Sequence, residues 1–325
     1  MPVEAINYPI KTPIPKTTEY LPMLQTLLHI EAGTLPNPIG VSVIGSYTEE
    51  NYKVTNFRGE AGSLLPTLGA AATIVDKRNK SNGKIVEGQQ YDVELSDGRV
   101  NVKTGAVGVK MDTWIFPFMQ LFATGAYLSM EQTTHIGDSI TIKNVPALNL
   151  IQRPTGKTID IYAPTKMSKI PFILPEDVDF RQIGNKLDGW LAMGGTNLAI
   201  GYKGFFLSCM IAGGYVKLDD LANDIKGFVK KPFMYIAPRV GYSLGGVFTA
   251  HFGVQRVELF GSTSGNDLSR LTFDSIRSYE TEIEKYPVNF LIGTNFTPMR
   301  DLGISFEYVF SPDVKGLNAE IAYRF

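Results

Sequence analysis

The sequence has a single cysteine, three histidines and few charged residues, and it lacks any long apolar run. Cys209 has no second cysteine to pair with, which excludes an internal disulfide and a cysteine-rich metal site. The absence of about 18 consecutive apolar residues excludes an ordinary transmembrane helix. The 31 basic residues balance the 32 acidic ones, so there is no basic field for nucleic acid. We therefore expect no nucleic-acid partner.

Glycine and aromatic residues are plentiful instead. The chain has 32 glycines and 15 tyrosines, and aromatic residues make up 11% of it. This composition is typical of many strands joined by tight turns, with aromatic rings at membrane interfaces. The length of 325 residues fits two ordinary domains or one large barrel, so length does not decide between them.

The last ten residues alternate with the period of two that is typical of a strand. One face is apolar and ends in two aromatic residues, Tyr323 and Phe325, while the opposite face carries Glu320 and Arg324. Residues 303–310 and 288–296 repeat this alternation. A lipid-facing exterior and a polar lumen require this pattern, because a closed barrel satisfies every backbone group inside the membrane. A soluble β-sandwich also alternates and is the rival architecture.

The aromatic-terminated last strand resembles the closing strand of Gram-negative outer-membrane β-barrel proteins. Residues 111–129 (MDTWIFPFMQLFATGAYLS) and, more loosely, residues 196–215 and 238–242 are similar to segments of uncharacterised outer-membrane barrels. The resemblance implies a bacterial outer-membrane location among lipid and lipopolysaccharide. It also implies that Tyr323 and Phe325 form the signal recognised by the barrel assembly machinery. It carries no assigned activity, and on this interpretation the chain is a mature form without its signal peptide.

Counting the strands gives ten or twelve. We expect the first strand at residues 39–57 and nine more from residue 103 onward, joined by short inner turns near residues 116–118, 202–204, 243–246 and 298–303. Residues 58–99 form a long outer loop that hides one further hairpin, at residues 70–75 and 90–95, and residues 131–191 form a second. The prediction is an all-β fold, a monomeric transmembrane antiparallel β-barrel of 12 strands over residues 37–325, with 10 strands as the alternative.

Residues 1–36 do not alternate and form an N-terminal extension. Prolines make its start extended, and Thr17 or Thr18 is placed to cap a short helix that runs to about Ile30, before Gly33. Two interpretations are open. The extension either packs on the periplasmic end of the barrel or lies free there, or it threads into the lumen as a plug.

Polar residues on the parity opposite to the apolar face are the candidates for lining the lumen. They are Lys110, Asp112, Asn197, Tyr235, Arg239, His251, Gln255, Asn289, Asn295, Glu307, Glu320 and Arg324. Both signs of charge are mixed among them. Charges inside a narrow barrel pair with one another, since an unpaired charge there is costly, so we expect a structural network. The alternative is a selectivity filter, which would need one sign to dominate a constriction.

Catalytic, metal and cofactor sites are not expected. His29, His135 and His251 are too scattered for a metal site. His135 has Asp138 and Ser139 nearby, but such a grouping arises by chance in most chains of this length, so we predict no enzyme. The glycine pairs at 194–195 and 213–214 do not open helices, so they form no phosphate-binding loop for a cofactor.

Two functions remain for a barrel of this size, whose interior is mostly filled by side chains. The first is a narrow channel or transporter for a small solute, closed by residues 1–36 or by the loop at 131–191. The second is a non-conducting surface protein, an adhesin, receptor or envelope-assembly component, that binds a ligand through its long outer loops.

Overall fold

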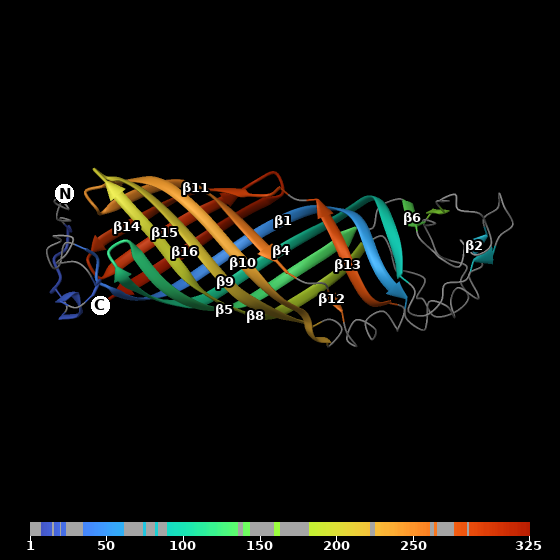
Figure 1. The fold of residues 1–325 in the computed structure, drawn as a ribbon, viewed down its shortest axis with the longest axis horizontal. Coiled ribbons are helices and arrows are strands. Elements are labelled where there is room, and N and C mark those ends of the chain that lie inside the picture. Colours follow the sequence, from blue (N-terminus) through green and yellow to red (C-terminus); the bar gives the residue numbers. More distant parts are fainter. Residues whose placement is uncertain are drawn as a thin grey trace.

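The protein forms a closed antiparallel β-barrel of ten strands in the computed structural model (Figure 1). The structure describes residues 8–14, 16–19, 21–23, 35–61, 74–75, 82–83, 90–135, 139–143, 159–162, 182–221, 225–260, 263–264, 276–284 and 286–325. The barrel strands are β1 (Ile39–Ala61), β4 (Gln90–Phe116), β5 (Met119–His135), β8 (Gln182–Tyr202), β9 (Phe205–Asp220), β10 (Ile225–Leu244), β11 (Phe248–Leu259), β14 (Asn289–Met299), β15 (Leu302–Phe310) and β16 (Val314–Arg324). Each strand pairs with the next one in this order, β16 pairs with β1, and β1 with β4, which closes the ring.

The predicted count of twelve strands is wrong, and the alternative of ten is correct. Residues 90–95 do not form a separate hairpin, because they are the outer part of β4 and pair with β1 from Asn56 to Glu60. Between the two stretches the register shifts, with Val54 opposite Gly98 and Asn56 opposite Glu94. The turn-like residues just before Gly98 therefore form a bulge inside one long strand. Of residues 70–75, the described pair Ile74–Val75 forms β2, which pairs with β3 (Asn82–Gly83) in a separate two-stranded sheet.

The predicted N-terminal helix is not supported. The described part of the extension contains one short 3-10 turn, η1 (Lys16–Glu19). It ends just before Pro22, whose ring is incompatible with the interior of a helix. Residues 24–34, where most of the helix was predicted, lie outside the described residues. Within the part of the chain that the structure describes, no helix is long and apolar enough to cross a membrane.

The apolar parity of the strands faces outward. Ile200, Met111 and Ile321 are 66%, 61% and 57% exposed, which a soluble sheet would not leave in water. Exposed aromatic side chains form a girdle near the inner end of the strands, with Tyr202, Phe205, Tyr242, Phe248, Phe296 and Tyr323. A second girdle near the outer end contains Tyr47, Tyr127, Trp190, Tyr215, Phe290 and Tyr308. The exterior thus matches a hydrocarbon slab bounded by two interfaces.

The two ends of the barrel differ. The end that carries both termini has short turns, between Phe116 and Met119, Tyr202 and Phe205, Leu244 and Phe248, and Met299 and Leu302, as predicted (Figure 1). At the opposite end β1 and β4, with 23 and 27 residues, run far beyond the 9 to 11 residues that a tilted strand needs to span a membrane. There β13 (Ile276–Glu284) pairs with β1, and β6 (Ser139–Lys143) with β4. On the outer sides β12 (Thr263–Ser264) pairs with β13, and β7 (Ile159–Tyr162) with β6.

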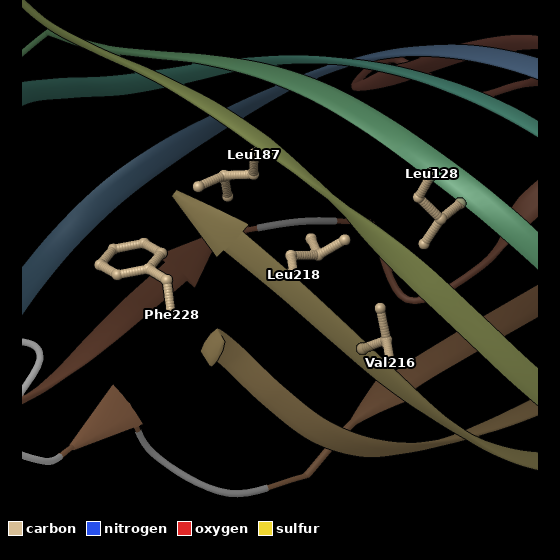
Figure 2. Close-up of a cluster of buried hydrophobic side chains, with 5 residues drawn as sticks. All are labelled: Leu128, Leu187, Val216, Leu218 and Phe228. Carbon is tan, nitrogen blue, oxygen red and sulfur yellow. The ribbon is translucent and has the colours of Figure 1, made fainter. Parts of the chain in front are cut away.

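The core is the barrel interior, and its outer part is apolar. Leu128, Leu187, Val216, Leu218 and Phe228 come from β5, β8, β9 and β10 and form one cluster, each at most 8% exposed (Figure 2). We call it the apolar cluster. The sequence analysis predicted a polar lumen throughout, so this apolar layer is a correction to it. The cluster buries its side chains against each other on the inner face of four neighbouring strands, which hydrophobic burial favours.

Candidate functional site

Below the apolar cluster, a charged group links strands that are not neighbours. Glu307 on β15 accepts two hydrogen bonds from Arg239 on β10, from Nε to Oε2 at 2.9 Å and from Nη2 to Oε1 at 3.2 Å. His251 on β11 places Nε2 3.0 Å from the same Oε2. Because β11 and β14 separate β10 from β15, the side chains of Arg239 and Glu307 meet across the concave inner face of the wall.

A glycine lets the histidine reach its partner. In the strand register His251 lies opposite Gly293 on β14, and Gly293 lies opposite Glu307 on β15. A Cβ atom on Gly293 would stand 2.5 Å from His251 Nε2 and 2.8 Å from the carbonyl oxygen of Phe306. The imidazole therefore crosses the intervening strand only because residue 293 has no side chain.

The same arrangement occurs where the barrel closes. Arg324 on β16 donates from Nη2 to Asp112 Oδ1 on β4, at 2.6 Å, across Gly40 on β1. A Cβ atom on Gly40 would lie 2.8 Å from Asp112 Oδ2 and 2.9 Å from Arg324 Nη1. Gln120 Nε2 donates to Asp112 Oδ1 as well, at 2.6 Å. These bonds tie the last strand to β4 and β5 across the closing strand β1.

Two further contacts complete the polar layer. Lys110 on β4 forms an ion pair with Glu320 on β16, and this pair also passes over β1. Tyr235 donates its hydroxyl to Gln255 Oε1 at 3.1 Å and receives Arg239 Nη2 at 3.5 Å. The charged side chains that form these ion pairs are between 1% and 26% exposed. Asp112 Oδ2 is buried without a hydrogen-bond partner among the described residues, but every charged side chain of these pairs faces an opposite charge. Pairs of this kind hold the wall rigid, because each charge is costly without its partner.

The structure brings most of the predicted lumen residues into these two groups and leaves three of them apart. Asn197 on β8 has a buried Oδ1 atom with no hydrogen-bond partner among the described residues. Asn289 and Asn295 lie half-buried on β14. Asn289 is the first residue of the strand, and Asn295 lies between Gly293 and the inner end of the barrel. The role of all the predicted residues in lining a pore stays a prediction.

Sequence reasoning missed three kinds of residue. It did not find the glycines at 40 and 293, because many of the 32 glycines look alike in sequence. It missed Asn37, whose side chain and carbonyl oxygen both bind Arg324. It also missed the apolar cluster, although β9 gave a signal: near its outer end Val216 and Leu218 occupy the parity that faces inward.

The described N-terminal residues lie on the inner mouth of the barrel (Figure 1). Ile10 donates its backbone NH to the carbonyl oxygen of Pro298 at 3.2 Å, and Met23 donates to that of Ile115 at 2.7 Å. Tyr8 is 8% exposed, and its ring centroid lies 5.6 Å from the guanidinium of Arg300. Burial raises the pKa of the Tyr8 hydroxyl, and the attraction of Arg300 and Arg324 only partly offsets this effect. The phenol is therefore neutral in its site.

The closed barrel, its apolar belt between two aromatic girdles and its polar inner layer define the protein as a transmembrane β-barrel of the bacterial outer membrane. Every strand of the ring is paired with a neighbour on both sides, which leaves no open sheet edge in the hydrocarbon region. The rival soluble β-sandwich is excluded, because the ring has no free edge and its large apolar side chains point outward.

Comparisons with known proteins add no closer assignment. No protein-family model matches the chain, and no curated protein matches it. Among solved structures, the chain is similar to the transport unit of the autotransporter AIDA-I from Escherichia coli, with 11% identity, 95% and 97% of the two chains covered and a TM-score of 0.35. It is also similar to the β-domain of the Bordetella autotransporter BrkA (10% identity, 88% and 99%, 0.35) and to an outer-membrane channel from Pseudomonas putida F1 (9%, 90% and 97%, 0.32). These TM-scores are too low to transfer a function.

Proposed function

We propose that the protein is a gated channel for small solutes in the outer membrane, closed at both ends in this conformation. The observation that carries the proposal is the order of layers along the interior. A polar layer, with Arg239, Glu307 and Lys110, lies between two parts of the chain that we propose as closures. The outer closure is the apolar cluster, and the inner closure is the N-terminal segment.

The apolar cluster is suited to act as a gate. A narrow constriction lined by apolar side chains expels water, so ions and polar solutes do not cross it until the side chains separate. Leu187 and Leu218 are 1% and 2% exposed, which supports a closely packed apolar layer on this part of the inner wall. In this proposal the polar layer behind it offers hydrogen-bond partners to a solute that has passed the gate.

The N-terminal segment is suited to be removable. Its contacts with the barrel include backbone bonds at Ile10 and Met23 and the packing of Tyr8 on Arg300. The barrel strands, in contrast, are held by continuous ladders such as that between β1 and β4. We therefore propose that residues 1–36 are a separable closing segment and that residues 37–325 are the conducting barrel.

The test is single-channel conductance in a planar bilayer. The full chain, a chain that lacks residues 1–36, and a Tyr8→Ala variant are compared. We expect conductance to appear or grow in the truncated chain and open events to become more frequent in Tyr8→Ala. Ile14→Ala is the matched control, because Ile14 is in the same segment but is 55% exposed. Silence from every version, with heat-modifiable migration proving a folded barrel, would reject the channel.

The alternative function is surface binding without conduction, and one observation favours it. The strands β1 and β4, with β13, β6, β7 and β12 at their sides, continue as a sheet beyond the membrane-spanning part of the barrel. An extended sheet outside the membrane is a platform for an adhesin or receptor contact. The test is a variant in which the outer parts of β1 and β4 are replaced by a short turn near residue 54. No conductance in bilayers, together with loss of surface attachment in this variant, would favour this function.

A further inference from the structure

The charges of the polar layer are balanced in number. Each arginine or lysine that the structure shows in the layer is joined to one carboxylate, in the pairs Arg239 with Glu307, Lys110 with Glu320 and Arg324 with Asp112. His251 shares Glu307 with Arg239 and adds a charge only when it is protonated. The layer therefore has no excess of either sign, which a strong preference for anions or for cations would require.

The pairs are also tight. Arg239 Nε lies 2.9 Å from Glu307 Oε2, and Arg324 Nη2 lies 2.6 Å from Asp112 Oδ1. Opposite charges at this separation act on a more distant ion as a dipole, because their Coulomb energies with that ion have opposite signs and nearly cancel. An ion in the lumen therefore gains little from these pairs to offset the loss of its hydration shell.

Neutral hydrogen-bonding groups lie among the charges. Gln120 binds Asp112, and Tyr235 binds Gln255. Asn197 lies opposite Gln120 in the register of β5 and β8. Amides and hydroxyls both donate and accept hydrogen bonds, so they suit the hydroxyl groups of an uncharged solute.

We propose that the channel admits small uncharged polar solutes, such as polyols or sugars, in preference to ions. This inference rests on the proposed channel function and adds the class of its substrate. The apolar cluster favours the same class. A constriction of apolar side chains removes the hydration shell of whatever crosses it, and this costs an ion far more than a neutral solute.

Other charges of inward parity lie level with the apolar cluster or nearer the outer end. Lys231 is opposite Val216 of the cluster in the register of β9 and β10, and Asp220 follows Leu218 by two residues. Glu50 is the outermost residue of β1 that pairs with β16. Each of these three charged residues has an interaction of its own. They lie outside the polar layer, so the proposal uses the charge balance of that layer and not of the whole interior.

The pair of Lys110 and Glu320 allows the balance to be tested in both directions. Their side chains are 15% and 26% exposed, the most of the three pairs in the layer. Lys110→Gln leaves the negative charge of Glu320 without its partner, and Glu320→Gln leaves the positive charge of Lys110. The two variants should therefore change the preference in opposite directions. The double variant removes both charges and should behave like the unaltered pair.

The experiment measures tracer uptake into liposomes of sorbitol, gluconate and N-methylglucamine at pH 8, where a free imidazole is uncharged. These solutes are linear chains of equal carbon skeleton that are neutral, anionic and cationic. All proteins are full length and carry Tyr8→Ala, which is expected to make opening more frequent. With Lys110 and Glu320 both present, sorbitol should enter at least about threefold faster than either ion.

The charge variants should change these relative rates by about threefold. Lys110→Gln should speed N-methylglucamine relative to sorbitol, and Glu320→Gln should speed gluconate. Lys103→Gln is the matched control, because Lys103 lies on the same strand as Lys110 but faces outward and is 49% exposed. It should leave all three rates unchanged.

Three results would overturn the substrate class and leave the channel function intact. One is entry of gluconate or N-methylglucamine as fast as sorbitol when both charges are present. Another is a barrel that conducts potassium chloride but excludes sorbitol. The third is equal relative rates in both single variants and in Lys103→Gln, with heat-modifiable migration proving folded barrels. The absence of both conductance and uptake of every solute would instead reject the channel itself.

Discussion

The guanidinium of Arg324, one residue from the C-terminus, crosses Gly40 and binds Asp112 two strands away, with 2.6 Å between Nη2 and Oδ1. The two side chains are 13% and 1% exposed, so the pair is shielded from water. Arg324 also donates to the carbonyl oxygens of Asn37 and Pro38, at 2.7 and 3.3 Å. One residue of the last strand therefore binds both the second strand and the residues that lead into the first strand, at the closing seam of the barrel.

Loss of this pair should destabilise the closed barrel. Arg324→Met leaves the carboxylate of Asp112 buried without its cation, for which a cost of about 3 kcal/mol is expected. We expect a lower urea midpoint of unfolding in detergent. Arg256→Gln is the control, because the pair of Arg256 and Glu258 is 51% and 41% exposed and should contribute at most about 1 kcal/mol. Equal midpoints for the two variants would contradict a stabilising role of the seam pair.

A side chain at position 293 should break the charged group around Glu307. Gly293→Val places carbon atoms where the imidazole of His251 now lies, so the histidine must leave its partner, at a cost of about 1 to 3 kcal/mol. The unfolding midpoint should fall. Gly125→Val is the matched control, since a Cβ atom there meets nothing within 4 Å. If both variants have the same unfolding midpoint, the contact between His251 and Glu307 over Gly293 does not contribute to stability.

Polar substitution of the apolar cluster should open the outer closure. Leu187→Ser with Leu218→Ser removes the two most buried leucines of the cluster and lets water enter the constriction. In the chain that lacks residues 1–36, we expect a larger single-channel conductance with this pair than without it. Leu198→Ala, in a lipid-facing leucine that is 40% exposed, should leave the conductance unchanged. A conductance that is the same in all three chains would place the gate elsewhere.

The C-terminal aromatic residues should matter for assembly more than for stability. Tyr323 and Phe325 are 56% and 45% exposed and face lipid, so they add little to the packing of the barrel. We expect Phe325→Ala to reduce the amount of protein in the outer membrane several-fold in cells, while the unfolding midpoint of the protein refolded in detergent changes little. Ile321→Ala, on the same face of β16 and 57% exposed, is the control. A comparable loss in both variants would refute a specific signal.

Local alternation was enough to place most strands. Residues 303–310 and 316–325 were predicted from the period of two alone, and β15 (Leu302–Phe310) and β16 (Val314–Arg324) agree with this. The prediction failed at the outer parts of β1 and β4. Residues 58–99 were predicted as an outer loop with a separate hairpin, but the ladder between β1 and β4 continues to Glu60 and Gln90, on both sides of the bulge. Pairing with a long neighbour overrides the local preference for a turn.

Alternation within each segment was sufficient to predict the class of fold and the lipid-facing parity of the strands. These follow from the period of the strand, which each segment carries independently of the others. The pairs of charges, the glycines that they cross and the apolar part of the interior depend on how the strands are arranged around the ring. Arg324 and Asp112 are brought together because β1 lies between their strands and the ring closes there. That register depends on pairing between residues far apart in the chain, and no local pattern encodes it.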